Sequence, residues 1–328
     1  MGDYLTPTEL KPILSSKRAN IYYLEMCRVM QKDGRVLYLT EGEKQRQYWN
    51  IPIANTTVIL LGTGTSITQA AVRMLASAGV LLGFCGGGAT PLFSGTEIEW
   101  FCPQSEYRPT QYVQGWLSFW FDKAKRLAAA KRMQRARCDF LEHVWSKDRD
   151  LQDAGFYADD DEVELALRGF RHGIEQASDT PQLLSAEAHF AKELYHYAAD
   201  RTDTASFVRD TAGTDDANSF LNHGNYLAYG LAASALWVLG IPHGFALMHG
   251  KTRRGALVFD IADLVKDTLV LPWAFICASQ DYSNKEFRMQ CIAKFTEHRA
   301  LDYMYEHIKA QSLQDKIPKA DVPGGAAS

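Results

Sequence analysis

Residues 111–137 read QYVQGWLSFWFDKAKRLAAAKRMQRAR, and this stretch separates two kinds of sequence. At positions i, i+4, i+7 and i+8 of a helix it carries an aromatic stripe: Tyr112, Trp116, Phe119 and Trp120. Such a stripe is more typical of a helix face that packs into a core than of a platform that stacks nucleic-acid bases. Apolar residues keep this helical spacing from Pro109 almost to the end of the chain, which predicts an all-helical part.

The residues before this stretch predict strands instead. Runs of β-branched and aromatic residues lie at 19–23, 36–40, 58–61 and 80–84. An Asp-Gly pair within residues 32–35 predicts a hairpin turn, because these residues adopt a positive φ at low cost. Residues 66–78 predict one amphipathic helix that ends at Gly79 and packs onto the strands.

These patterns predict the fold class and the domain organisation. We expect an α+β protein, with an N-terminal β-rich domain followed by an all-helical C-terminal domain. The predicted bounds are 1–95 for the β-rich domain, 96–315 for the helical domain and 316–328 for a flexible tail.

The composition is that of an ordinary globular protein. The 328 residues are 46% hydrophobic and 23% charged, which excludes disorder and a collagen-like fold. Six cysteines are scattered without a C-x-x-C pair, as expected of free thiols in a reducing cytoplasm. The first ten residues lack the basic and apolar regions of a secretory signal, so we expect a cytoplasmic protein. The uncharged run 226–248 is interrupted by glycine and proline, and it predicts a buried core helix rather than a membrane span.

Charge is segregated along the chain. The net charge is −4, but residues 123–137 hold seven basic and no acidic residues, whereas residues 148–164 hold eight acidic residues and one arginine. The basic run has two interpretations. A solvated helix face is the commoner reason for such a run, and a face that binds phosphates is the alternative. The charge pattern alone leaves both open.

Two glycine motifs do not support nucleotide binding. Gly-Thr-Gly at 62–64 lacks the third glycine of a dinucleotide-binding loop, because Ile67 stands at that position. Gly-Lys-Thr at 250–252 lacks the earlier glycine of a phosphate-binding loop, because Phe245 stands there.

Residues 249–266, HGKTRRGALVFDIADLVK, hold the most informative polar residues. If the second half of this segment is helical, Asp260, Asp263 and Lys266 fall three apart and share one face. Two such carboxylates repel each other unless a bound cation or nearby basic side chains neutralise them. With His249 in the preceding loop, the oxygen and imidazole groups suit Mg²⁺ or Mn²⁺ rather than a structural zinc ion. The alternative is an ordinary salt-bridged helix surface.

Three separated blocks of sequence carry a family resemblance. They are Glu187-Ala-x-x-Ala-Lys-x-x-Tyr195, Asn218-x-x-Leu-Asn222-x-Gly-x-Tyr226, and 249–266 with its Asp-x-x-Asp-x-x-Lys step. In these blocks the chain resembles the CRISPR adaptation integrases, the first-numbered Cas proteins, which are metal-dependent DNA endonucleases. Ala188 stands where the family usually has glycine, a difference that small-residue packing should tolerate. Residues 16–20, 104–109 and 241–254 resemble the subtype I-F (Ypest) branch of the family.

The resemblance implies a role for individual residues. The family's metal ligands fall on Glu187, His249 and Asp263, with Asp260 and Lys266 as supporting catalytic residues. Glu187 carries no signal of its own, because a lone helix glutamate is usually solvated. Tyr195 and Asn222 are expected to pack and to support the site rather than to catalyse.

The resemblance also implies an assembly. The β-rich domain would form a homodimer, and the helical domain would be catalytic. Two such dimers would flank a dimer of the second Cas protein, which in this branch is fused to the third, a helicase-nuclease. The protein would act in the bacterial cytoplasm and would not need a membrane.

The implied reaction inserts new spacers into a CRISPR array. The 3′-hydroxyl of a captured double-stranded DNA fragment attacks a phosphodiester at the edge of a repeat, at a site that holds Mg²⁺ or Mn²⁺. The residues expected to hold DNA phosphates are Lys123, Arg126, Arg132, Arg135, Lys251, Arg253 and Arg254.

Two rival functions fit the same residues. A stand-alone metal nuclease for branched or single-stranded DNA would use water as its nucleophile. A DNA-binding scaffold would use the carboxylates only to support its structure.

Overall fold

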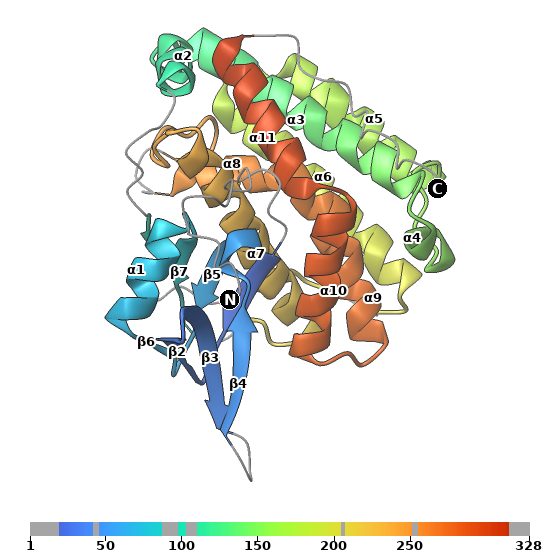
Figure 1. The fold of residues 1–328 in the computed structure, drawn as a ribbon. Helices are drawn as coiled ribbons and strands as arrows, with labels where there is room; N and C mark the ends of the chain where they lie inside the picture. The colour runs from blue at the N-terminus through green and yellow to red at the C-terminus, as the bar shows by residue number, and fades with distance from the viewer. Residues whose placement is uncertain are drawn as a thin grey trace, which may run out of the picture.

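The computed structural model describes residues 20–41, 46–86, 98–102, 110–204, 207–250 and 255–314. Within these ranges a β-rich N-terminal part is followed by a helical part, which confirms the predicted α+β class (Figure 1). One sheet has the strand order β1-β5-β7-β8 and the other has the order β4-β3-β2-β6. The strands are β1 (Asn20–Leu24), β2 (Cys27–Lys32), β3 (Arg35–Glu41), β4 (Arg46–Ile51), β5 (Thr56–Leu61), β6 (Ser66–Ile67), β7 (Leu81–Phe84) and β8 (Glu99–Phe101).

The predicted hairpin turn at 32–35 is confirmed. β2 and β3 pair antiparallel up to Lys32 and Arg35, and the two residues between them have positive φ angles, 50° for Asp33 and 71° for Gly34. Two positive φ angles give the turn a twist that matches the twist of the flanking strands.

The predicted helix at 66–78 begins later than expected. α1 spans Gln69–Ser77 and is capped by Thr68, whose hydroxyl oxygen accepts a hydrogen bond from the Ala71 N–H at 3.3 Å. Ser66 and Ile67 form β6 instead, because the free edge of β2 pairs with them. A partner strand distant in sequence thus decides where this helix starts.

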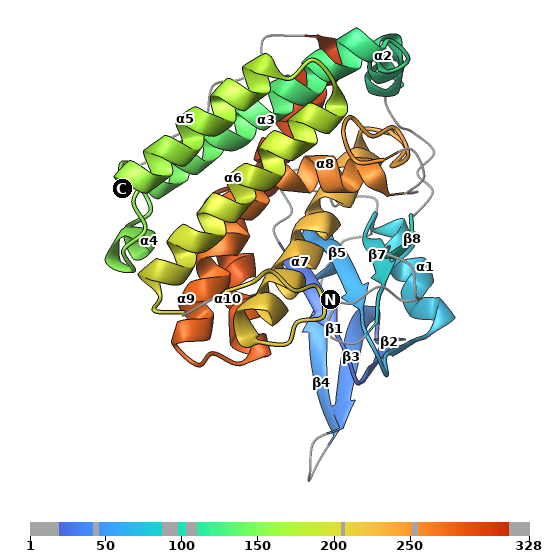
Figure 2. The same cartoon turned by 180° about the vertical axis from the view of Figure 1, so that it is seen from behind.

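The helical part follows from residue 110. Its helices are α2 (Gln111–Trp120), α3 (Lys123–Trp145), α4 (Arg149–Asp153), α5 (Asp161–Gln176), α6 (Thr180–Arg201), α7 (Asp216–Val238), α8 (Ala256–Val265), α9 (Leu271–Ser279), α10 (Asn284–Glu297) and α11 (Ala300–Leu313). Figure 2 shows α3, α5 and α6 side by side, while α7 lies against β5. The run predicted to be a buried helix at 226–248 falls largely in α7, whose residues there are mostly buried. No helix among the described residues is both long and apolar enough to cross a membrane.

β5 joins the two parts because it is buried on both faces. Ile59 and Leu61 belong to a core formed with the second sheet and α1, whereas Val58 and Leu60 belong to the large core of the helical part. Alternate side chains of a strand point to opposite faces, so one strand serves both cores. Gly230 of α7 permits the close approach, since a Cβ there would lie 3.2 Å from a methyl group of Val58.

Two other expectations from the sequence can be placed in the fold. All six cysteines are free, five of them are buried and Cys102 is half-buried, as expected of free thiols. β8 lies beyond residue 95, so the strand-rich part reaches at least Phe101. The division at 95 and 96 stays a prediction, and the tail at 316–328 lies outside the described residues.

Candidate metal centre

The Asp260 carboxylate fixes the loop that precedes α8. Its Oδ2 accepts the Leu247 N–H at 2.6 Å, and its Oδ1 accepts the N–H groups of Met248 and His249, both at 3.2 Å. The Asp260 side chain is buried. A buried carboxylate that accepts several backbone N–H groups holds the chain around it in one conformation.

Two indoles of α2 hold the same loop from the other side. Trp116 Nε1 donates to the Phe245 carbonyl at 3.1 Å, and Trp120 Nε1 donates to the Ala246 carbonyl at 2.7 Å. Trp116 is fully buried and Phe119 nearly so, which confirms the interpretation of this stripe as a core face. The spacing of the stripe does not show that the Trp116 and Trp120 indoles also hydrogen-bond to a loop far downstream in the sequence.

His249 is oriented by Asp260 and lies beside Asp263. Its Nδ1 is 2.8 Å from Asp260 Oδ1 and 3.9 Å from Asp263 Oδ2. When Nδ1 carries its proton toward Asp260, Nε2 presents a lone pair, which is the arrangement of a metal-binding histidine. Burial lowers the pKa of His249, but the hydrogen bond to Asp260 and the charge of Asp263 outweigh burial, so the pKa is raised.

Asp263 is a buried carboxylate with unused acceptor capacity. Lys266 Nζ lies 2.5 Å from Asp263 Oδ1. Apart from this ion pair, neither oxygen accepts a hydrogen bond from the described residues. Burial raises the pKa of Asp263, but the charges of Lys266, His249 and Arg137 outweigh burial and lower it, so the carboxylate stays ionised.

Glu187 reaches this region from α6 and contacts an arginine of α3. Arg137 Nη1 lies 3.1 Å from Glu187 Oε1, while Arg137 Nε donates to Asp267 Oδ2 at 2.5 Å and Nη2 contacts the same oxygen. Burial lowers the pKa of Arg137, but the charges of Asp267, Glu187 and Asp263 outweigh burial and raise it. Burial also raises the pKa of Asp267, partly offset by Arg137 and Lys266. Two guanidinium nitrogens on one carboxylate oxygen favour the ionised form of Asp267.

Arg137 and Asp267 were missed as site residues by sequence reasoning. Arg137 belongs to the basic run 123–137, but its side chain is only 2% exposed and contacts carboxylates of the protein itself, so it does not face DNA. Asp267 follows Lys266 directly and gives no spacing signal. The two side chains come together only because α3 packs against the segment after α8.

A π-helical turn, Lys266–Val270, separates α8 from α9 and contains both Lys266 and Asp267. Pro272 has no N–H, so it cannot bond to the carbonyl four residues earlier, that of Thr268. Trp145 of α3 donates its indole N–H to this carbonyl at 3.0 Å instead. Single π-helical turns inside helices are frequent at functional sites.

The sequence blocks 187–195 of α6 and 218–226 of α7 meet through Arg209. Its guanidinium donates to Asn218 Oδ1 at 2.9 Å and to Asn222 Oδ1 at 2.6 Å. It also hydrogen-bonds to the hydroxyl of Tyr195, whose pKa is raised mainly by burial. This arrangement fits the packing and supporting roles expected for Tyr195 and Asn222.

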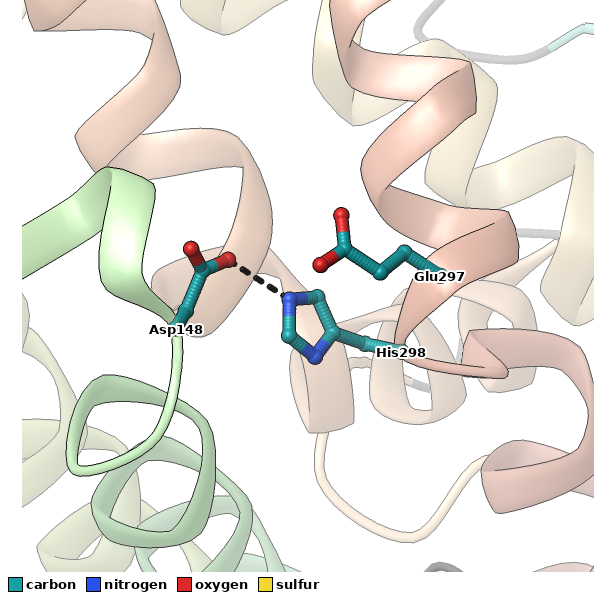
Figure 3. A group of neighbouring side chains, drawn as sticks. All are labelled: Asp148, Glu297 and His298. Atoms are coloured by element: carbon teal, nitrogen blue, oxygen red, sulfur yellow. Dashed lines mark hydrogen bonds and ion pairs between the residues drawn. The ribbon is translucent and has the colours of Figure 1, made fainter. Parts of the chain in front are cut away.

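The predicted ligands share one electrostatic neighbourhood without forming a tight group. The charges of Glu187 and Asp263 both act on Arg137 and on Lys266. Among the described residues, one group of three acidic or histidine side chains has ligand atoms that all lie within 4.8 Å of one another, and it lies elsewhere (Figure 3). Its members are Asp148, Glu297 and His298.

That second group already holds a cation of the protein itself. Lys294 Nζ lies 3.1 Å from Asp148 Oδ2, 2.7 Å from Asp150 Oδ2 and 2.9 Å from Glu297 Oε2. Asp148 also caps α4 by accepting the N–H groups of Asp150 and Leu151, and it contacts His298 Nε2 at 2.7 Å (Figure 3). An ammonium group with three carboxylate partners explains the cluster as a structural link between α4 and the end of α10.

The residues predicted to bind DNA divide into three sets. Lys123 and Arg135 of α3 are exposed. Arg126 lies over the Trp120 ring at 5.1 Å, and Arg132 is half-buried and donates to Gln311 Oε1 at 3.0 Å. Lys251, Arg253 and Arg254 lie outside the described residues.

Comparison with known proteins gives concordant matches. A family model described as CRISPR associated protein Cas1 matches residues 21–296. The chain is 55% identical to the CRISPR-associated endonuclease Cas1 of Pseudomonas aeruginosa over 94% of this chain and 97% of the relative. It is 50% identical to the CRISPR-associated endonuclease Cas1 of Pectobacterium atrosepticum over 97% of this chain and 98% of the relative.

Solved structures match in fold. A TtCas1–DNA complex covers 94% of this chain and 96% of its own, with a TM-score of 0.66 and 22% identity. A casposase bound to its integration product covers 92% of this chain and 93% of its own, with a TM-score of 0.68 and 12% identity. At these identities the similarity concerns the fold alone.

Proposed function

This chain belongs to the CRISPR associated protein Cas1 family, and from that premise we propose that it is a metal-dependent DNA endonuclease and integrase that inserts new spacers into a CRISPR array. Its two relatives at 55% and 50% identity are both named endonucleases. The observation that carries the proposal is the pairing of Asp263 with His249. A buried carboxylate whose oxygens, apart from the ion pair with Lys266, accept no hydrogen bond from the described residues lies beside an imidazole whose Nδ1 contacts Asp260, which would leave Nε2 for a metal.

The charges around this pair support a divalent cation. Four carboxylates, Glu187, Asp260, Asp263 and Asp267, are accompanied by two permanently charged bases, Arg137 and Lys266, which leaves a formal charge of −2 when the carboxyls are ionised. A neutral histidine adds none. One Mg²⁺ or Mn²⁺ ion would neutralise this excess, and both ions accept a mixed set of oxygen and imidazole ligands.

Glu187, His249 and Asp263 would hold the metal. When bound, it would act as a Lewis acid that stabilises charge on the phosphorane and on the leaving oxygen. Asp260 keeps the His249 proton on Nδ1, and Lys266 keeps Asp263 ionised. The reaction forms a phosphodiester with the 3′-hydroxyl of a captured fragment and releases the 3′-hydroxyl of the repeat, so the number of phosphodiester bonds is conserved.

The DNA would lie along the basic side chains of α3. Lys123 and Arg135 are exposed there and can contact phosphates regardless of sequence. The names of two structural relatives, a TtCas1–DNA complex and a casposase bound to its integration product, are consistent with a DNA substrate. We extend the proposal to a homodimer, to the subtype I-F branch, and to a partner formed by the second Cas protein fused to the helicase-nuclease third.

The nucleophile distinguishes this function from that of a stand-alone nuclease. The protein, its Cas partner, Mg²⁺ or Mn²⁺ and a supercoiled repeat plasmid are mixed with DNA fragments that end in a 3′-hydroxyl or in a dideoxynucleotide. We expect joined products only with the hydroxyl fragment, because an integrase must place that group at the phosphodiester. Equal cutting of the plasmid with either fragment, without joining, would establish the stand-alone nuclease. Binding without cutting or joining would establish the scaffold.

A further inference from the structure

Arg137 connects more parts of the site than any predicted ligand does. Its guanidinium contacts Glu187 on α6 and Asp267 in the π-helical turn. It also donates from Nη1 to Gln134 Oε1 at 3.1 Å, and Gln134 Nε2 in turn contacts Met248 Sδ at 3.1 Å, next to His249. Arg137 therefore contacts Glu187 and the turn after α8 directly, and it is linked to the loop of His249 through Gln134.

The arginine is also held rigidly. The aromatic rings of Phe170 and Phe190 lie 5.8 Å and 5.7 Å from the guanidinium carbon, and the side chain is 2% exposed. Asp267 binds two of its nitrogens. A planar group packed against two stacked aromatic rings and bound along one edge by a carboxylate has little freedom to reorient.

Glu187 is the less buried partner in this contact. Its side chain is 18% exposed, and of its two carboxylate oxygens only Oε1 contacts Arg137. A half-buried glutamate without a partner can adopt more than one rotamer, and ordering it on binding costs free energy. Arg137 can order this side chain before any cation arrives, and its contact is through Oε1 rather than Oε2.

We propose that Arg137 is a positioning residue that holds Glu187 in the orientation needed to bind the metal, with Asp267 as its fixed anchor. This inference rests on the proposed function, since it requires the metal site. It assigns a role to two residues that have no role in the reaction described above. Because Asp267 balances the charge of Arg137, the pair orients Glu187 without adding a net positive charge that would repel a divalent cation.

The test is Mn²⁺ binding to the full-length protein without DNA, measured by calorimetry. Arg137→Met is combined with Asp267→Leu, so that no buried charge is left without a partner and the net charge is unchanged. We expect this double variant to fold and to bind Mn²⁺ about threefold to tenfold more weakly, the cost of ordering one long side chain. In a Glu187→Gln background the same double substitution should leave the affinity unchanged, since no carboxylate remains to be oriented.

A matched pair controls for the loss of a helix-linking ion pair. Arg171 of α5 binds Glu142 of α3 at 2.6 Å and does not contact Glu187. Arg171→Met with Glu142→Leu should leave Mn²⁺ affinity as in the wild type. His249→Ala supplies the background of ions bound elsewhere, including any at Asp148.

The outcomes separate the inference from the function on which it rests. If His249→Ala binds Mn²⁺ as the wild type does, His249 is not a metal ligand. The proposed metal site and the positioning role of Arg137 are then both overturned. If His249→Ala binds weakly but the Arg137 and Asp267 variant retains full affinity, only the inference is overturned. An equal loss with and without the Glu187 carboxylate would also overturn it, because the effect would then be general and not exerted through Glu187.

Discussion

Asp260 and Asp263 lie one helical turn apart on α8 but have different surroundings. The Asp260 carboxylate accepts hydrogen bonds from three backbone N–H groups and contacts His249 Nδ1, whereas Asp263 contacts only charged side chains. Asp260→Asn should therefore destabilise the fold by about 1–3 kcal/mol, because an amide placed there loses the acceptors that hold the loop. Asp263→Asn keeps an amide oxygen next to Lys266 but loses the negative charge, and it should abolish the tightest Mn²⁺ binding.

Thermal unfolding without metal and calorimetric titration with Mn²⁺ measure the two effects separately. A variant at residue 260 that unfolds like the wild type would show that the loop is held by α2 alone. Tight Mn²⁺ binding by Asp263→Asn would remove this residue from the ligand set.

Substitution of any one of the three predicted metal ligands should have the same effect on catalysis. Glu187→Ala, His249→Ala and Asp263→Ala are each expected to abolish DNA cleavage and strand transfer while the protein still folds and binds DNA. Removing an acid from a site with a formal excess of negative charge relieves repulsion, so stability should not suffer greatly. Cleavage assays on branched DNA, run beside a binding assay at the same salt concentration, provide the comparison. A wild-type rate in any one variant would remove that residue from the site.

Whether the sequence predicts that two residues of this site meet depends on how far apart they lie along the chain. Asp260, Asp263 and Lys266 share a face because helical spacing requires it, and His249 lies close in sequence. Arg137 meets Asp267 across 130 residues, and no periodicity links two positions that far apart. Glu187 was found only through the family resemblance.

At the scale of elements, helices and strands were predicted correctly where the sequence pattern was long. Their ends were predicted wrongly where a hydrogen-bonding partner far away in the sequence pairs with the segment. β6 replaced the first residues of a predicted helix because β2 offered an edge, and the segment after α8 adopts a π-helical turn next to Pro272. Each outcome depends on a hydrogen-bonding partner that local propensity does not contain.

The burial of His307 within α11 makes stability sensitive to acid. His307 is buried next to Tyr303, their ring centroids being 4.2 Å apart, and its Nδ1 has no hydrogen-bond partner among the described residues. Burial lowers the pKa of His307 to about 4. The unfolded chain takes up this proton below pH 6.5, so the stability contributed by neutral His307 is complete above pH 6.5 and is lost as the pH falls toward 4.

His307→Phe should remove this dependence. Between pH 7 and pH 5 the variant should lose about 2 kcal/mol less unfolding free energy than the wild type, as measured by urea unfolding at both pH values. His243, whose pKa burial also lowers to about 4, stays in both proteins and contributes equally to each. The exposed His196→Gln serves as the control. Equal pH dependence in the wild type and His307→Phe would show that His307 becomes protonated without cost in the folded state.

At the scale of the molecule, the β-rich part and the helical part predicted from the sequence are in closer contact than a single boundary between them suggests. The sequence pattern separates strands from helices correctly, yet β5 contributes side chains to both cores and β8 lies after the predicted boundary. Arg288 of α10 also lies over the Tyr23 ring of β1 at 4.5 Å. The packing of the strands against the helical part is thus set by contacts that composition cannot show.

The basic run of α3 has one face toward the core and one toward solvent, and this decides which charges can reach DNA. Lys123 and Arg135 are exposed, whereas Arg126 and Arg132 already contact Trp120 and Gln311. Lys123→Gln with Arg135→Gln should weaken binding to all DNA sequences alike, since phosphates carry no sequence information. If both side chains contact phosphates, the slope of log K against log salt should decrease in magnitude by roughly 1 to 2, at about 0.9 per phosphate.

The salt-dependence experiment needs a control variant that loses two positive charges from another part of the surface. Arg149→Gln with Arg168→Gln removes two exposed arginines of α4 and α5, so its net charge equals that of the test variant. Because counterion release depends on local contacts and not on total charge, this control should keep the wild-type slope. Equal slopes in all three proteins would assign the exposed side of α3 to solvent, and the DNA would then have to be sought on another face of the helical part.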